Sequence, residues 1–179
     1  GATILLDASA STITTSGRDL SAIDIVDNNK APVMSYNGLG KCEASLQVSG
    51  VAFYGSLWQQ AAAQGMTVVV SAGNSGPDDC DNVATTKAAQ FGLGVNGVAS
   101  TPWNVAVGGT DFLAAWMSPS TYWSTMNDPV TQASALSYIP ESPFNDSCAS
   151  SAIQFKGGSI DPEANCNNPQ FSSLLNIVA

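Results

Sequence analysis

The sequence predicts an α/β fold built around a buried parallel sheet. Three observations predict it: strand and helix patterns alternate through residues 1–112, an unbroken β-branched run follows the clearest helix, and polar turn segments follow two expected strands. This combination is typical of parallel sheets that are covered by their crossover helices. We expect residues 1–179 to belong to a single domain, with a βαβ core in residues 1–112 and a loop-rich continuation in residues 113–179.

The first two expected elements are a strand and a helix. The short apolar run at residues 3–6 predicts a strand, and Asp19 is expected to cap a helix that ends at Asn28 or Asn29. Pro32 prevents this helix from continuing. The apolar face of the helix is expected to carry Leu20, Ile23 and Val26.

The next elements form the predicted βαβ unit. Residues 33–35 predict a short strand, and residues 45–64 form the clearest helix pattern, with Gly65 where a C-cap belongs. The apolar positions of this helix are Leu46, Phe53, Leu57 and Ala61. Residues 66–70 and 104–107 predict two further strands. A crossover through the helix places the strands at 33–35 and 66–70 in one sheet, as neighbours.

Composition and charge exclude several classes of function. The chain has 44% hydrophobic and 11% charged residues, so it is neither a disordered tail nor a coiled coil. Its net charge of -9 argues against nucleic acid and anionic membranes as partners. Since the chain has no histidine, it cannot hold a complete Ser-His-Asp set by itself. No apolar run approaches the ~20 residues of a membrane helix.

The cysteines and the chain ends indicate the setting of the protein. Few lysines, much Ser, Thr and Asn, and four cysteines favour a secreted, oxidised protein, with free buried cysteines as the alternative. The cysteines are Cys42, Cys80, Cys148 and Cys166. The chain begins without Met and ends in an apolar segment at residues 174–179, so we expect a piece of a longer polypeptide.

Polar segments follow the two neighbouring strands of the expected βαβ unit. They occupy residues 35–38 and 71–76. Ligands of open parallel sheets bind outside the carboxyl ends of the strands, so these loops are expected to form two walls of one cleft. The alternative is that they are simple turns, because Gly, Asn and Ser are the usual turn residues.

These segments also carry a family resemblance. The chain resembles the subtilisin-fold serine peptidases in residues 33–38 (VMSYNG), in residues 42–43 and in residues 68–76 (VVVSAGNSG). It is similar to the sedolisins, the serine-carboxyl peptidases of that fold, in residues 99–110 (ASTPWNVAVGGT). Further collinear matches lie in residues 19–22, 31–35, 135–141 and 145–148. The resemblance implies a three-layer subtilisin-like fold, incomplete at both ends.

The implied activity is endopeptidase cleavage of extracellular proteins or peptides by a serine nucleophile. In sedolisins a Glu-x-x-x-Asp pair on one helix face replaces histidine as the base. Neither that pair nor the Ser-Gly-Thr-Ser nucleophile motif occurs in this chain. We therefore expect both, and the calcium site of the family, to lie outside it; no cofactor or metal ligand set is assigned to the chain, which alone is expected to be inactive.

The resemblance implies one catalytic residue, Asn74, as an oxyanion-hole donor. Sedolisins usually have Asp at this position, which donates a hydrogen bond only while protonated. Asn74 departs from that pattern and matches the subtilisins, where an asparagine amide donates at any pH. The alternative is a turn residue that tolerates positive φ.

The resemblance also implies the substrate-binding residues. Ser35, Tyr36 and Gly38 match the strand edge that pairs with extended peptide backbone. Ala72 and Gly73 match the opposite wall of the first specificity pocket, where small residues allow close approach. A disulfide between Cys42 and Cys80 would tether the two walls and is the preferred pairing. Cys148 and Cys166 would then pair with each other, or each with a cysteine outside the chain.

Three functions follow from this sequence. The first is a secreted, monomeric sedolisin-type serine endopeptidase whose partner is a peptide or protein substrate. The second is a subtilisin-type peptidase, favoured by Asn74. The third is a non-catalytic secreted homologue that keeps the scaffold.

Two other patterns resemble ligand-binding sites but are not assigned that role. Asp78, Asp79 and Asp81 resemble a cation cluster but are expected to form a solvated acidic loop. Residues 92–97 (GLGVNG) resemble a nucleotide-binding glycine loop, yet they lack the preceding strand and the correct spacing.

Overall fold

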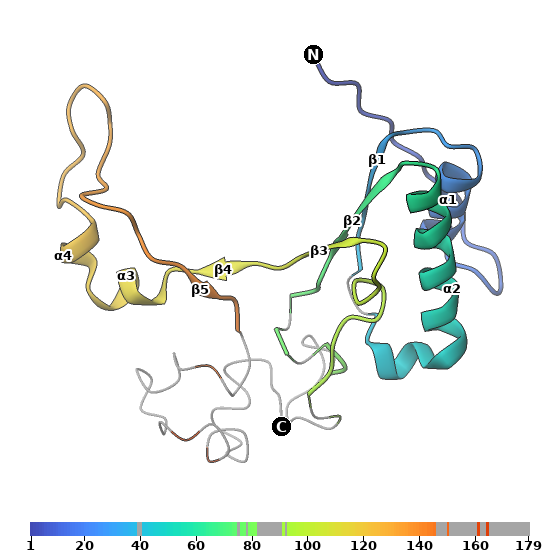
Figure 1. The fold of residues 1–179 in the computed structure, drawn as a ribbon. Coiled ribbons are helices and arrows are strands. Elements are labelled where there is room, and N and C mark those ends of the chain that lie inside the picture. The colour runs from blue at the N-terminus through green and yellow to red at the C-terminus, as the bar shows by residue number, and fades with distance from the viewer. Residues whose placement is uncertain are drawn as a thin grey trace.

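The computed structural model describes residues 1–38, 41–74, 76–77, 79–81, 91, 93–145, 150, 161 and 164. The main elements are α1 (Gly17–Asp27), β1 (Val33–Tyr36), α2 (Glu43–Ala63), β2 (Thr67–Ser71) and β3 (Val105–Val107) (Figure 1). They are followed by β4 (Thr110–Asp111), α3 (Leu113–Met117), α4 (Pro119–Tyr122) and β5 (Ser142–Pro143).

A three-stranded parallel sheet organises the fold, as the sequence predicts. The strand order is β1-β2-β3, and the register aligns Ser35 with Val69 and Val69 with Val105. The α2 helix connects β1 to its neighbour β2, which confirms the βαβ unit and the adjacency of its strands. Figure 1 shows α1 and α2 together on one side of this sheet.

The hydrophobic core lies between the sheet and these two helices. Alternate strand residues point into it, because successive side chains of a strand face opposite sides of a sheet. The largest fully buried side chains are Trp58, Val26, Val68, Val70 and Val98. The indole nitrogen of Trp58 donates to the carbonyl of Val98 at 3.1 Å, so this polar atom is satisfied inside the core.

The α1 helix begins three residues earlier than the sequence predicts. Ser16 is its N-cap and accepts a hydrogen bond from the amide of Asp19. Asp19 itself lies in the first turn, so its prediction as the N-cap is wrong. Ser is as good an N-cap as Asp, and the carboxylate of Asp19 is used instead by tyrosines of β1 and α2.

The α2 helix also begins earlier than predicted, and its buried face includes the predicted apolar positions Leu57 and Ala61. The buried residues are Tyr54, Leu57, Trp58 and Ala61. Of the other two predicted apolar positions, Leu46 packs partly buried against the core and Phe53 is 38% exposed. Gln47, at φ 56°, interrupts the helical backbone near the start of α2. Gly65 follows the C-cap at φ 79°, which confirms its role in ending the helix.

The strand predicted at residues 3–6 does not form. Ile4 and Leu6 are 90% and 89% exposed. Among the described residues no strand pairs with this segment. An apolar run has strand propensity, but a strand also requires a hydrogen-bonded neighbour.

The chain leaves the parallel sheet after β3. Figure 1 shows residues 110–143 extending away from α1 and α2, with β4 and β5 at the base of this extension. Those two strands pair antiparallel, with Thr110 opposite Pro143. Within the described part of the chain, no helix is both long and apolar enough to cross a membrane.

Candidate functional site

The carboxyl ends of β1 and β2 lie side by side. We name them the β1 end (residues 35–38) and the β2 end (residues 71–74). The amide of Gly38 donates to the hydroxyl of Ser71 at 3.0 Å, and that hydroxyl donates to the side-chain oxygen of Asn37 at 3.4 Å. The register of the two strands therefore brings together the two segments that the sequence predicts as walls of one site.

The β1 end carries three predicted substrate-binding residues, and two of them, Tyr36 and Gly38, are buried. The side chain of Tyr36 is buried, whereas Ser35 is exposed. Gly38 is buried, and its amide is already used by Ser71. A β-carbon at Gly38 would lie 2.5 Å from the carbonyl oxygen of Ser71, so only glycine fits there. Their roles in substrate binding stay predictions.

The buried Tyr36 belongs to a polar network beneath the β1 end. Its hydroxyl donates to Asp19 at 2.5 Å, and the hydroxyl of Tyr54 donates to the same carboxylate at 2.8 Å. Lys41 lies 3.4 Å from the second oxygen of Asp19. Burial raises the pKa of Tyr36, and the hydrogen bond to Asp19 raises it further. The Tyr36 hydroxyl is thus a neutral donor that anchors β1 to both helices.

The β2 end presents Asn74 at the surface. Ala72 and Gly73 are half-buried, and Asn74, the next residue, is exposed. The amide of Ala72 donates to the carbonyl of Val107 at 2.9 Å, which fixes the β2 end to β3. Gly73 adopts φ 94°, and a β-carbon there would lie 2.4 Å from an oxygen of Asp79. Glycine is therefore required by both backbone and space. The oxyanion role of Asn74 stays a prediction.

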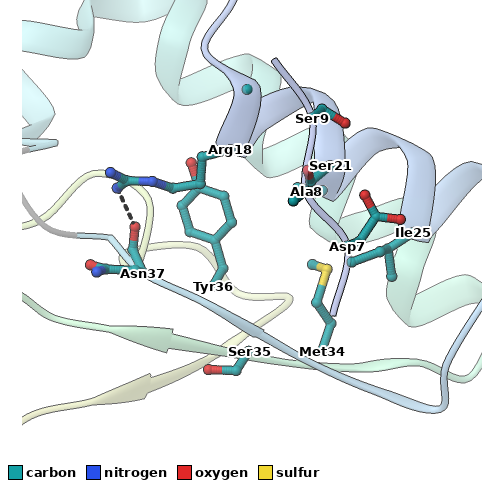
Figure 2. A pocket seen from close by; sticks show the side chains of 12 residues that line it. Asp7, Ala8, Ser9, Arg18, Ser21, Ile25, Met34, Ser35, Tyr36 and Asn37 are labelled. Carbon is teal, nitrogen blue, oxygen red and sulfur yellow. Dashed lines mark hydrogen bonds between the residues drawn. The ribbon is translucent and has the colours of Figure 1, made fainter. Parts of the chain in front are cut away.

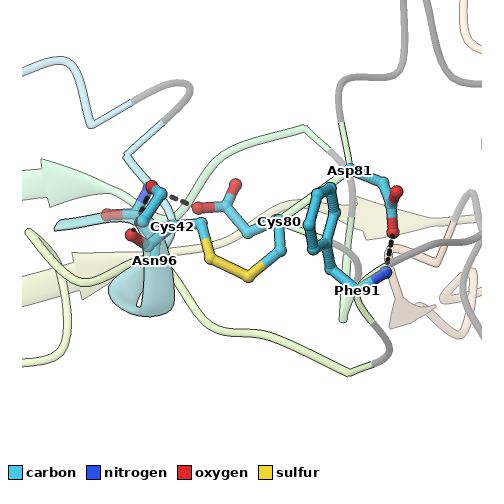
Figure 3. The surroundings of a disulfide bond; sticks show 7 residues. Cys42, Cys80, Asp81, Phe91 and Asn96 are labelled. Carbon is cyan, nitrogen blue, oxygen red and sulfur yellow. Dashed lines mark hydrogen bonds between the residues drawn. A yellow bond between two sulfur atoms is a disulfide. The ribbon is translucent and has the colours of Figure 1, made fainter. Parts of the chain in front are cut away.

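A disulfide links the segments that follow the two ends. Cys42 and Cys80 are bonded, with a Cα–Cα distance of 4.8 Å, which confirms the preferred pairing (Figure 3). The bond closes a loop across 38 residues of sequence separation. In the chain-entropy account such a loop contributes about 4 kcal/mol to stability. Cys148 and Cys166 lie outside the described residues.

The acidic loop beside this disulfide is buried, so its prediction as a solvated loop is wrong. Asp79 and Asp81 are 7% and 3% exposed, and Asp78 lies outside the described residues. Burial raises the pKa of Asp79 to about 6, although a hydrogen bond from Asn96 opposes the shift. Asp81 accepts from the amide of Phe91 at 3.3 Å. A composition rich in Asp predicts exposure, but here the loop is folded inward beside the disulfide.

Sequence reasoning also missed Asn96, which lies between the two ends. Its side-chain nitrogen donates to the carbonyl of Gly38 at 2.6 Å and to the carboxylate of Asp79 at 3.0 Å. It is only 4% exposed and lies next to the disulfide (Figure 3). Its backbone bridges to Cys42 in antiparallel fashion.

The glycines around Asn96 explain the pattern that resembles a nucleotide loop. A β-carbon at Gly94 would lie 2.4 Å from the sulfur of Cys80, and one at Gly97 would lie 2.8 Å from the Cα of Glu43. The glycines therefore let this segment pass against the disulfide and the start of α2. Their close approach is to protein atoms. The only signal in the sequence for the role of Asn96 was the spacing of Gly94, Asn96 and Gly97.

A hollow of about 390 Å³ lies beside β1, between this strand, α1 and residues 7–9. Figure 2 shows Arg18 extending from α1 towards the β1 end. Its guanidinium donates to the carbonyl of Asn37 at 2.7 Å, which adds a third element to the contacts that position this end. Ser35 and Met34 also line the hollow.

Comparison with known proteins gives one solved structure. Neither the protein-family models nor the curated proteins include a match. The solved structure is Pseudomonas sedolisin (serine-carboxyl proteinase) complexed with two molecules of pseudo-iodotyrostatin, which is similar to this chain with 27% sequence identity and a TM-score of 0.47. The match covers 70% of this chain and 34% of that chain, so it spans about a third of the length of the sedolisin.

Proposed function

We propose that this chain supplies the substrate-binding strand and the oxyanion donor of a secreted, sedolisin-type serine endopeptidase. The observation that carries the proposal is the pairing of the β1 end with the β2 end at the carboxyl edge of adjacent parallel strands. The collinear motifs that resemble sedolisins include both ends, and this edge is where parallel sheets bind ligands.

In the proposed mechanism Asn74 stabilises the negative oxygen of the tetrahedral intermediate. Its exposed carboxamide carries two N–H donors and does not titrate between acid and neutral pH. Removal of such a donor from subtilisin costs about 2.7–4 kcal/mol of transition-state stabilisation, a known example that we use as the scale. The bond from Ala72 to β3 and the close packing of Gly73 against Asp79 support a preorganised position.

The serine nucleophile and the carboxylate base of the proposed reaction are not among these 179 residues. No Ser-Gly-Thr-Ser motif and no Glu-x-x-x-Asp pair occurs in the sequence. The proposal therefore requires both groups from other polypeptide. The calcium site of the resembling family is likewise proposed to lie elsewhere.

Hydrolysis of casein by the full-length gene product tests the proposal. Asn74→Ala is expected to lower kcat roughly 10²–10³-fold with little change in KM, because the donor acts only in the transition state. The matched control is Asn127→Ala, an exposed asparagine of the 110–143 segment, which should leave both constants unchanged. The 179-residue chain alone should not hydrolyse casein at any pH. An unchanged kcat in Asn74→Ala would contradict the oxyanion assignment.

A subtilisin-type peptidase is the second candidate, and the amide at position 74 favours it. The two candidates differ in their base, a carboxylate or an imidazole. A carboxylate base stays active well below pH 5, whereas an imidazole base loses activity as it is protonated near pH 6.5. The pH profile of kcat in the full-length product separates the two, and a complete lack of hydrolysis would favour the non-catalytic homologue.

A further inference from the structure

We propose that Asn96 is a positioning residue, which holds the β1 end and the β2 end at the separation that peptide cleavage requires. This inference rests on the proposed function. It assigns the role to a buried side chain that lies between the two ends.

The Asn96 carboxamide has a full set of hydrogen bonds. Its nitrogen donates to the carbonyl of Gly38 at 2.6 Å and to the carboxylate of Asp79 at 3.0 Å. Its oxygen accepts from the amides of Val98 and Ala99 at 3.1 and 3.0 Å. A carboxamide offers two donor hydrogens and two lone pairs, so all four are used. The partners also fix its orientation, because a flipped amide would face two donors with its nitrogen.

Each donor bond of Asn96 leads to a different end of the site. The bond to Gly38 holds the β1 end directly. The bond to Asp79 fixes a carboxylate that packs against Gly73 of the β2 end, so closely that a β-carbon at Gly73 would lie 2.4 Å from one of its oxygens. Gly73 is joined to Asn74, the proposed oxyanion donor. Asn96 thus connects the proposed substrate strand to the proposed catalytic amide through two contacts.

The backbone around Asn96 is itself fixed. The amide of Gly97 donates to the carbonyl of Lys41 at 2.9 Å, and the amide of Gly94 donates to the carbonyl of Pro77 at 2.9 Å. The Cys42–Cys80 disulfide joins the segments on either side. A buried, fully bonded side chain on such a frame holds its partners more precisely than an exposed loop residue. Precision matters here, since a misplacement of 1 Å can cost about 100-fold in rate.

The nitrogen and the oxygen of the Asn96 carboxamide have different partners. A substitution that changes only the nitrogen therefore separates the positioning role from the role of the oxygen in holding the turn at residues 98–99. Asn96→Asp keeps an oxygen for Val98 and Ala99 but loses both donors, and it places two carboxyl groups against each other. Adding Asp79→Asn to this variant places an amide donor at position 79 opposite the carboxylate acceptor at position 96, which restores a hydrogen bond between the two positions. The double variant repairs the connection to Gly73 and Asn74 and leaves Gly38 without its donor.

The experiment measures casein-peptide hydrolysis at pH 7 by the full-length gene product. Asn96→Asp is expected to lower kcat about 10–100-fold and to raise KM. Asn96→Asp with Asp79→Asn is expected to recover kcat to within about threefold of the original protein while KM stays raised. The matched control is Asp81→Asn, which changes a buried carboxylate of the same loop and should shift neither constant by more than about twofold.

Hydrogen exchange of the variants checks that the fold is retained. The amides of Val98 and Ala99 should stay protected in Asn96→Asp. If they lose protection, Asp79→Ala replaces it as the test, because this change breaks the link without touching the turn; it should lower kcat and leave KM unchanged.

Four outcomes would count against these proposals. Kinetic constants within twofold of the original in Asn96→Asp, with the turn protected, would overturn the positioning role. The same holds if the double variant shows no recovery, or if Asp79→Ala keeps its kcat. A full-length product that hydrolyses nothing would instead overturn the proposed function, and the inference with it.

Discussion

Two carboxylates lie equally deep in this protein, yet their pKa values shift in opposite directions. Asp19, beneath the β1 end, is 8% exposed, and Asp79, behind the β2 end, is 7% exposed. Burial acts to raise the pKa of Asp19, but hydrogen bonds from Tyr36, Ser16 and Tyr54 and the charge of Lys41 outweigh it, so the pKa is lowered. Burial raises the pKa of Asp79 to about 6, because only Asn96 opposes it.

The difference teaches that the number and kind of partners decide the charge of a buried acid, rather than depth alone. The Asp19 region is held by hydrogen bonds and an ion pair to a carboxylate that stays charged. The Asp79 region is held by a disulfide and a carboxamide around a carboxyl group whose pKa is raised to about 6. Each of the following predictions changes one side of this comparison.

The largest effect is expected from removing the covalent tie of the Asp79 region. Replacement of both Cys42 and Cys80 by serine should lower the free energy of unfolding by about 4 kcal/mol, because the unfolded chain regains the entropy of an open loop. Urea unfolding of the 179-residue chain measures this change. Serine substitution is preferred to reduction, because it changes only this bond. A loss below about 1 kcal/mol would show that the carboxamide network holds this region without the disulfide.

The next effect concerns the charge of Asp19. Asp19→Asn should lower the free energy of unfolding at pH 7 by roughly 3 kcal/mol, since Lys41 and two tyrosine hydroxyls lose a charged acceptor. A lowered folded-state pKa stabilises above the unfolded value near 3.9, and this contribution is lost as the pH falls below it. The variant should therefore show a weaker loss of stability on acidification below pH 4.

Asp27→Asn is the control for this charge effect. Asp27 is an exposed acid of the same helix, and its carboxylate accepts from Gln60 at 2.9 Å. The cost of the control should stay within about 0.5 kcal/mol. Equal costs for the two variants would show that the buried network adds nothing beyond a surface contact.

Asp79 is expected to have the opposite pH dependence. Its folded-state pKa of about 6 lies above the unfolded value near 3.9, so the folded state binds the proton more strongly. The free energy of unfolding should therefore fall by roughly 2–3 kcal/mol as the pH rises from about 4 to 6, and then stay level. Asp79→Asn should abolish this fall. An identical pH dependence in the variant would mean that another group titrates in this window.

The smallest effect is expected from one hydroxyl of the Asp19 network. Tyr54→Phe removes the 2.8 Å hydrogen bond to Asp19 and keeps the ring packed between Tyr36 and Trp58. The cost should be roughly 1–2 kcal/mol at pH 7, and less when Asp19 is protonated. Tyr138→Phe, at an 82% exposed tyrosine, is the matched control and should change stability little. If the loss of stability in Tyr54→Phe does not depend on pH, the contribution of this hydroxyl does not depend on the charge of Asp19.

The sequence alone determined the elements whose patterns are local. The β-branched run of β2, the turn at Gly65 and the long helix α2 could be predicted because hydrophobic periodicity and glycine punctuation act over a few residues. The adjacency of β1 and β2 followed from the rules for crossover connections. Four cysteines allow three pairings, so the sequence supported the Cys42–Cys80 bond only as a preference, which the structure confirms.

Only the tertiary structure decided which polar residues are buried and what they contact. Asp79 and Asn96 look like ordinary loop residues in the sequence, and they meet Gly38 and Gly73 only because three chain segments converge beside a disulfide. Residues 3–6 have the pattern of a strand and remain unpaired among the described residues, since a strand depends on a neighbour as well as on its own side chains. Local propensity acts along the chain, whereas burial and hydrogen-bond partners are set by residues distant in sequence. The proposed site is built from contacts between such distant residues.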